Sequence, residues 1–254
     1  MNKNLSIATM TWARDAKEEK LLRESLLELS KLNIPAFITD GGSGTDFLNF
    51  ITSFPTFTLL EPKAKGVWPQ VQTSLEAAYK KGSDFIIYTE PDKINFIKQD
   101  LPDMLTRISV NEQSGVIIAV RSSPGFESYP RFQQMTETTI NNCCAEVTGN
   151  DTDYTYGPFI MNRLLVPYLH ELNNNIGWGW RPYTFVIASR LNYKVESFEG
   201  DYFCPVDQRD DDAMERIYRM RQLSENIEAI VLASKVSLNS DKPLKEFFNH
   251  GAKE

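Results

Sequence analysis

Two carboxylates follow a short apolar segment, and their types and spacing suit the binding of a divalent cation. Residues 85–88 are apolar and rich in β-formers, and Glu90 and Asp92 come directly after them, separated by Pro91. Residues i and i+2 of an extended chain point the same way, so these carboxylates can share a hard cation. Such a cation would bind a phosphate group of a ligand. The alternative is a helix-initiating turn, with Pro91 opening a helix and Asp92 favouring its positive end.

The elements that must position these acids alternate along the chain. This alternation predicts an α/β fold, with a mostly parallel central sheet and helices on both faces. Ligands of such sheets bind beyond the carboxyl ends of the strands, where Glu90 and Asp92 would lie. The expected strands are residues 5–10, 35–39, 56–60, 85–88, 115–120 and 194–198. The expected helices are residues 17–31, 46–53, 68–81, 94–105, 131–147, 162–172, 183–191 and 211–234.

Composition and charge narrow the class of protein. The 254 residues are 41% hydrophobic and 24% charged, which is typical of a soluble globular chain with a sizeable core. No linker or repeat interrupts the order, so we expect one domain over residues 1–236 and a polar tail over residues 237–254. The net charge of −7 argues against a nucleic-acid partner. No apolar run suits a signal peptide or a membrane span, which indicates a cytoplasmic protein.

The cysteines are consistent with a cytoplasmic location. Cys143, Cys144 and Cys204 lack zinc-type spacing, and an adjacent pair is an improbable disulfide, so we expect buried free thiols. Only two histidines are present, which leaves few candidates for a histidine base or a multi-histidine metal site.

A loop rich in glycine and tryptophan lies at residues 173–180. Its glycines allow close backbone approach to a ligand, and its tryptophans offer flat faces for a sugar ring, although the aromatics could equally fill the core. Arg181 follows and can anchor a phosphate or carboxylate with its planar fork, or pair with a nearby acid at the surface. Arg121 and Arg131 are similar candidates at a ligand-facing rim. Gly157 is expected to shape an acceptor loop, with an ordinary turn as the alternative.

The last predicted helix is preceded by an acidic cluster. Carboxylates are favourable in a first helical turn, so we interpret the cluster as capping rather than a metal site. Apolar side chains recur along the helix at helical spacing, which predicts docking on the core or on another subunit, and hence a possible homo-oligomer. Arg219 and Arg221 flank that face, and one of them could reach a diphosphate. The acidic residues are Asp207, Asp210, Asp211 and Asp212, and the apolar residues are Ile217, Met220, Leu223, Ile227 and Ile230.

The order of these motifs resembles a known family, the nucleotide-sugar-dependent glycosyltransferases of the GT-A fold. The resemblance is to the large family 2 group and to the mannosylglycerate-synthase-like enzymes, over roughly the first 230 residues. Four segments carry it: residues 9–14 after the first strand, the acidic-glycine-serine turn at residues 39–44, residues 65–68 before a helix, and residues 90–92 in the place of the DxD motif.

The resemblance implies transfer of a hexose from a nucleoside-diphosphate sugar to a small-molecule or carbohydrate acceptor. It implies that Asp40 contacts the base or ribose, Glu90 the ribose, and Asp92 a Mg²⁺ or Mn²⁺ ion. That ion would stabilise charge on the leaving nucleoside diphosphate. The nucleotide-binding residues implied are Thr9, Thr11, Trp12, Arg14, Asp40, Gly41, Lys65, Gly66 and Glu90.

Two departures from the family pattern concern the catalytic groups. Glu90 stands where the family has aspartate, which lengthens that arm and changes metal geometry. Arg181 stands where inverting enzymes place an acidic pair, and a guanidinium cannot accept a proton, so the base lies elsewhere or the reaction retains configuration. The family branch also has a late histidine on its metal, for which Asp201 or Cys204 would substitute. The residues expected at the metal are Asp92, Glu90 and Asp201, and the catalytic candidates are Asp92, Arg181 and Trp180.

Two other functions fit parts of this pattern. A noncatalytic relative could bind a nucleotide sugar or glycan without turnover, which the missing acidic pair permits. A nucleotidyltransferase shares the α/β layout and the metal, but such enzymes open with a glycine-rich phosphate loop, and no glycine precedes Gly41.

Overall fold

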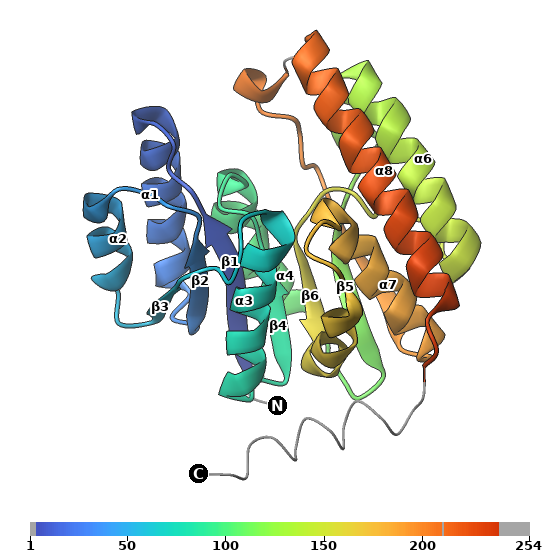
Figure 1. Cartoon of the computed structure of the whole chain (residues 1–254), viewed down its shortest axis with the longest axis horizontal. Coiled ribbons are helices and arrows are strands. Elements are labelled where there is room, and N and C mark those ends of the chain that lie inside the picture. The colour runs from blue at the N-terminus through green and yellow to red at the C-terminus, as the bar shows by residue number, and fades with distance from the viewer. Residues whose placement is uncertain (1–3, 210, 239–254) are drawn as a thin grey trace.

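The computed structural model describes residues 4–209 and 211–238, and its centre is a seven-stranded sheet (Figure 1). The strand order is β3-β2-β1-β4-β6-β5-β7, and every strand except β6 runs parallel to the others. The predicted α/β fold with a mostly parallel sheet is therefore confirmed. The strands are β1 (Leu5–Thr11), β2 (Ala36–Asp40), β3 (Phe57–Leu60), β4 (Phe85–Tyr88), β5 (Ser114–Arg121), β6 (Phe159–Asn162) and β7 (Lys194–Gly200).

Helices cover both faces of the sheet, as predicted. Apolar side chains of α1, α2 and α4 form one buried cluster with the sheet, and those of α3, α6, α7 and α8 form a second. The α-helices are α1 (Ala16–Lys31), α2 (Thr45–Thr52), α3 (Val67–Lys81), α4 (Leu101–Arg107), α5 (Ser123–Glu127), α6 (Arg131–Thr148), α7 (Trp180–Arg190) and α8 (Ala213–Lys235). The remaining segments are the π-helical turn η1 (Phe96–Asp100) and the 3₁₀ turns η2 (Arg163–Glu171), η3 (Gly177–Gly179) and η4 (Val206–Gln208).

Strand β6 is the main difference from the predicted elements. The sequence predicts a helix from residue 162 and no strand before it, whereas Phe159–Asn162 pairs antiparallel with both β4 and β5. Its first residue, Phe159, faces Tyr88 at the carboxyl end of β4. Because β6 runs against its neighbours, the loop that precedes it lies at the same edge of the sheet as Glu90. This placement brings residues 153–158 to the candidate site.

Two predicted helices are irregular for reasons that involve proline. The helix expected at residues 94–105 is divided into η1 and α4, and Pro102 lies in the first turn of α4. Proline has no N–H to donate, so it favours a helix start and disfavours a helix interior. The helix expected at residues 162–172 is the 3₁₀ segment η2, with Pro167 inside it. Residues 163–171 therefore form a compact connection rather than an α-helix.

Helix α8 begins with the predicted cap and packs beside α6 (Figure 1). The Asp212 side chain accepts a hydrogen bond from the Glu215 backbone at 2.9 Å, so capping is confirmed there. Of the predicted apolar face, Ile230 is buried in the core, whereas Ile217 is 56% and Met220 49% exposed, so docking of that part on another subunit stays a prediction. Asp210 and residues 239–254 of the predicted tail lie outside the described residues.

The three cysteines are free thiols, as expected. Cys144 and Cys204 are buried, and Cys143 is partly exposed. Within the described part of the chain, no helix has the length and apolar character needed to cross a membrane.

Candidate active site

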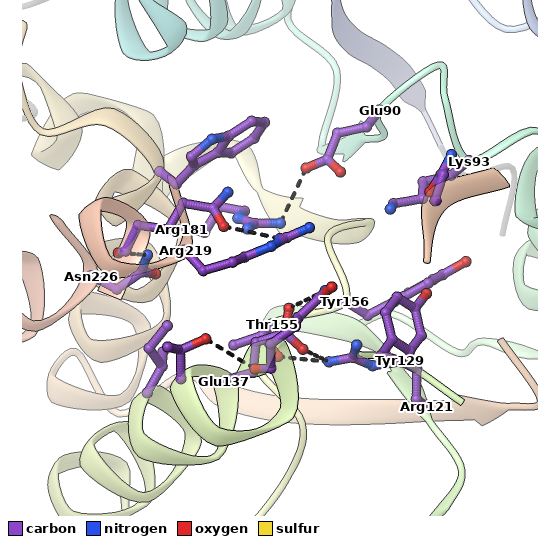
Figure 2. A pocket seen from close by; sticks show the side chains of 16 residues that line it. Glu90, Lys93, Arg121, Tyr129, Glu137, Thr155, Tyr156, Arg181, Arg219 and Asn226 are labelled. Carbon is purple, nitrogen blue, oxygen red and sulfur yellow. Dashed lines mark hydrogen bonds and ion pairs between the residues drawn. The ribbon is translucent and has the colours of Figure 1, made fainter. Parts of the chain in front are cut away.

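A cavity of about 90 Å³ opens at the carboxyl edge of the sheet. Its walls come from the turn after β4, the loop before β6, the segment around α7, and the facing sides of α6 and α8 (Figure 2). Four basic side chains line it, against two acidic ones. Cationic donors that line a concave site can bind an anionic ligand. The basic residues are Lys93, Arg121, Arg181 and Arg219, and the acidic residues are Glu90 and Glu137.

The Glu90 carboxylate is buried and paired with Arg181 (Figure 2). Arg181 Nη1 donates to Glu90 Oε1 at 3.1 Å, and the Tyr88 hydroxyl lies 3.5 Å from the same oxygen. Burial raises the pKa of the Glu90 carboxyl, and the Arg181 guanidinium opposes that rise. The first position of the predicted DxD-like motif is therefore neutralised by an arginine from the chain itself.

Gly157 makes the Glu90–Arg181 pair possible. Its φ is +131°, a conformation that side-chain-bearing residues rarely adopt. A Cβ at this position would lie 2.8 Å from Glu90 Oε2 and 3.2 Å from Arg181 Nη1. The predicted role of Gly157 in shaping a loop is consistent with this geometry, because the loop before β6 passes directly against the ion pair.

The glycine-tryptophan loop packs mainly on α8. A Cβ on Gly179 would lie 2.7 Å from the Ala229 side chain, so this glycine serves the contact between loop and helix. Trp178 is half-buried and lines the cavity, and its indole N–H donates to the Tyr218 hydroxyl at 2.9 Å. The Arg181 guanidinium lies 4.9 Å from the Trp178 ring centre, within cation–π range. Trp178 therefore helps to orient Arg181.

Trp180 was predicted as catalytic, and the structure corrects this. Its side chain is fully buried. The ring centre lies 4.7 Å from that of Tyr88, 5.8 Å from Trp68 and 5.5 Å from Phe159. Trp180 therefore packs in the core behind the cavity and has no surface that a ligand can reach.

Arg121 forms the floor of the cavity rather than its rim. Its Nε and Nη2 donate to the two oxygens of Asp153 at 2.7 and 2.9 Å. Its Nη2 also lies 2.8 Å from Glu137 Oε2, in an ion pair without hydrogen-bond alignment. Burial raises the pKa of Asp153, but Arg121 and hydrogen bonds from Thr155 outweigh that effect and lower it to about 2. Arg131, the other predicted rim residue, is exposed at the start of α6.

The predicted nucleotide-binding side begins with a tightly bonded turn at Asp40. Its Oδ1 accepts the backbone N–H groups of Gly42 at 2.8 Å and Ser43 at 2.6 Å. Its Oδ2 accepts the hydroxyls of Thr11 at 2.8 Å and Ser43 at 2.7 Å. The Thr9 hydroxyl donates to the Thr89 carbonyl at 2.6 Å. The side chains of Thr9, Thr11 and Asp40 thus fix the loops at this edge of the sheet.

The groups exposed beside that turn differ in character. Trp12 is 51% exposed, and the guanidinium of Arg14 lies 5.6 Å from its ring centre. Arg14 is also paired with Glu18. Lys65 and Gly66 are exposed immediately before α3. A nucleotide contact by any of these residues, or by Gly41, stays a prediction.

The predicted three-carboxylate metal set is not formed in this structure. Across residues 4–209 and 211–238, no group of three or more histidine, cysteine, aspartate or glutamate side chains is placed to hold an ion. Asp201 instead accepts a hydrogen bond from the Ser122 hydroxyl at 2.6 Å, and Arg181 holds Glu90. The Asp92 side chain is 45% exposed. A half-exposed carboxylate fits a Mg²⁺ or Mn²⁺ ion whose other ligands are water and substrate phosphate, so Asp92 alone suits the implied metal.

Several lining residues escaped the sequence analysis. Lys93 directly follows the acidic motif, and its position was the one signal available. Burial alone would lower the pKa of Lys93, but Asp92 and Glu90 outweigh that effect and raise it. Five more lie on α6 and α8, whose mixed polar faces resemble ordinary solvent-facing surface: Gln133, Thr136, Glu137, Gln222 and Asn226.

Comparisons with known proteins bear on the fold. The sequence matches no protein-family model and no curated protein. In structure, the chain is similar to glucosyl-3-phosphoglycerate synthase from Mycobacterium tuberculosis in complex with UDP, with a TM-score of 0.66 and 13% identity over 94% of this chain and 82% of that chain. The chain has the GT-A fold.

Two further structures of the same synthase give similar values. One contains Mn²⁺, UDP-glucose and phosphoglyceric acid, with a TM-score of 0.61 and 11% identity. The other contains Mn²⁺, UDP-glucose and glycerol 3-phosphate, with a TM-score of 0.61 and 12% identity. Each alignment covers 94% of this chain and 82% of the synthase chain. The fold that the sequence resemblance implied is confirmed, and identities this low establish the fold alone.

Proposed function

We propose that this protein is a glycosyltransferase that moves a sugar from a nucleoside-diphosphate donor to a small acceptor carrying an anionic group. The observation that carries the proposal is the basic cavity at the carboxyl edge of a GT-A sheet, directly beside the turn that ends β4. In open α/β sheets, ligands bind at this edge. The surplus of basic side chains suits the charges of a nucleotide sugar.

The donor nucleotide would lie along the loops after β1 and β2. The exposed Trp12 ring offers a flat face for a base, and the turn held by Asp40 fixes the backbone beside it. The diphosphate would then reach Asp92. A Mg²⁺ or Mn²⁺ ion there would supply positive charge to the leaving group when bound.

Arg181 would stabilise the charge that develops on the departing diphosphate. Its guanidinium is oriented before the reaction by Glu90 and Trp178, and its buried Nε–H has no hydrogen-bond partner among the described residues. Preoriented donors of this kind contribute strongly to catalysis in a site that excludes water.

The cavity also bears on which group accepts the acceptor's proton. The lining carboxylates are Glu90 and Glu137, and an arginine engages each of them. Each carboxylate is held in place by a guanidinium group rather than directed at an acceptor hydroxyl. The arrangement favours a departing phosphate oxygen as the proton acceptor, and therefore retention of configuration.

The acceptor would occupy the part of the cavity between α6 and α8. Arg219 and the side-chain amides of Gln133, Gln222 and Asn226 line this part and suit a phosphate or carboxylate together with hydroxyl groups. A volume of about 90 Å³ favours a small acceptor. The synthase of the same fold was crystallised with phosphoglyceric acid and with glycerol 3-phosphate, which belong to this chemical class.

A thermal-shift panel tests the donor half of the proposal. The purified protein is heated with UDP, GDP, ADP, CMP or dTDP, each with Mn²⁺ and with a chelator. A ligand that binds the native state raises the melting temperature, and we expect at least one diphosphate to do so. If none does, the proposed function is wrong. Binding without sugar transfer would instead support the noncatalytic alternative.

A further inference from the structure

The Lys93 side chain lines the cavity, and no residue that the structure describes accepts a hydrogen bond from its Nζ. Its backbone is fixed: its N–H donates to the Glu90 carbonyl at 3.0 Å, and its carbonyl accepts from the Ile97 N–H at 3.0 Å. The side chain is only 16% exposed, and the nearest carboxylate oxygen, Asp92 Oδ2, lies 3.5 Å from Nζ. A lysine has three N–H donors, so an anionic ligand in the cavity can accept hydrogen bonds from this one.

The other basic residues of the cavity are better satisfied. Arg121 donates to Asp153 at 2.7 Å, Arg181 donates to Glu90 at 3.1 Å, and Arg219 lies 2.8 Å from Glu215. Arg219 also donates to Gln222 at 3.0 Å, so within the described parts of the chain Lys93 is the one cation of these four without a side-chain hydrogen bond. In Figure 2, Lys93 lies on the side of the cavity opposite Arg181 and Arg219. An anion between them would supply its missing acceptors.

The position of Lys93 in the chain indicates which anion this is. Lys93 directly follows Asp92, at the carboxyl end of β4, and it also lines the cavity. A phosphate beside the metal-binding carboxylate is therefore within reach of the Lys93 side chain. The acceptor's anionic group is the other possible source of the same chemistry, but the lining residues assigned to it lie across the cavity on α6 and α8.

We propose that Lys93 binds the diphosphate of the donor directly, as a fixed cation that acts in addition to any metal at Asp92. The inference rests on the proposed function. It implies that part of the affinity for the diphosphate persists when the metal is removed.

The test measures binding of the nucleoside diphosphate that the panel selects, by isothermal titration calorimetry with Mn²⁺ and with a chelator. In both conditions, Lys93→Met is expected to weaken diphosphate binding about tenfold or more, as for loss of a charge-assisted hydrogen bond. Binding of the corresponding nucleoside, which has no phosphate, should stay within about threefold. Lys93→Arg should retain part of the affinity. The control is Lys98→Met, which removes the same charge from an exposed position in η1.

A stability measurement separates ligand binding from a structural role. Without ligand, Lys93→Met should stay folded and melt somewhat lower than wild type, because Asp92 loses the cation 3.5 Å from its carboxylate; the diphosphate affinity then decides between the two roles. A lower melting temperature together with unchanged diphosphate binding would make Lys93 a structural partner of Asp92 and overturn the inference.

Two binding outcomes would also overturn it, and a third would remove its basis. The first is equal diphosphate affinity in wild type and Lys93→Met. The second is a loss confined to phosphoglyceric acid, which would place the acceptor's anion at Lys93 instead. A wild-type protein that binds no diphosphate would refute the proposed function itself, and the wild-type arm identifies that case.

Discussion

Gly157→Ala tests whether the loop before β6 holds the Glu90–Arg181 pair in place. The new methyl group would lie 2.8 Å from Glu90 Oε2 and 3.2 Å from Arg181 Nη1, so at least one partner must move. The backbone at φ +131° adds a cost of about 1–3 kcal/mol for a residue with a side chain. Overpacking of a buried contact typically adds a further cost of about 1–3 kcal/mol.

We therefore expect Gly157→Ala to lower the free energy of unfolding by about 2–4 kcal/mol, since neighbours absorb part of the strain. For a chain of this size, each kcal/mol lowers the melting temperature by about 2–4 °C. Differential scanning calorimetry measures that fall. Titration with the selected diphosphate should also show weaker binding, because Arg181 loses its orientation.

Gly149→Ala is the matched control. Gly149 ends α6 at φ +70°, and a Cβ there would meet nothing within 4 Å. This variant carries only the backbone cost of about 1–2 kcal/mol and should leave diphosphate binding unchanged. Equal losses of stability in the two variants, with wild-type diphosphate binding in both, would refute the role assigned to Gly157.

Three further variants probe other parts of the site. Asp153→Asn tests the buried Arg121 pair: the pKa of Asp153 is lowered from 3.8 to about 2 in the folded state, so the charged form contributes about 2 kcal/mol above pH 4. That contribution is lost as the pH falls toward 2. Urea unfolding measures the free energy of unfolding at pH 6 and pH 3, and the decrease between them should be smaller in Asp153→Asn than in wild type. An equal decrease in both proteins would contradict the pairing. Asp92→Asn should abolish the Mn²⁺-dependent part of diphosphate binding in calorimetry and spare the part that persists with a chelator; unchanged metal dependence would remove Asp92 from the metal. Trp12→Ala should weaken the binding of every nucleotide about tenfold or more, because base stacking on an aromatic ring contributes about 1–3 kcal/mol. The melting temperature should not fall, because Trp12 is 51% exposed. Nucleotide affinities equal to those of wild type would exclude Trp12 as the residue on which the base stacks.

The fold was predictable where a segment's own residues decide its structure. Strands β1, β2 and β4 are contiguous apolar segments, and the structure places each within two residues of its expected bounds. Strand β6 was missed because its strand character depends on pairing with β4 and β5, which are distant in sequence. Pro102 and Pro167 were visible in the sequence, but whether each proline breaks, kinks or starts a helix depends on the packing around it.

The candidate site was predictable in part. Glu90 and Arg181, which motif position predicted, both line the cavity, although their contact joins residues 91 positions apart and has no local signal. Trp178 and Trp180 are alike in sequence, and packing alone distinguishes the cavity residue from the core residue. The α6 and α8 side chains enter the site because these two helices pack side by side.

A transfer assay is the most direct test of the central claim. The protein is incubated with UDP-glucose, GDP-mannose or another nucleotide sugar selected by the panel, with phosphoglyceric acid as the acceptor and Mn²⁺ present. Mass spectrometry then measures the product. We predict an acceptor whose mass has increased by one hexose residue, formed by wild type and lost in Arg181→Met. If wild type binds the donor but forms no such product with phosphoglyceric acid or with related phosphorylated and carboxylated acceptors, the claim that the cavity transfers a sugar to a small anionic acceptor is contradicted.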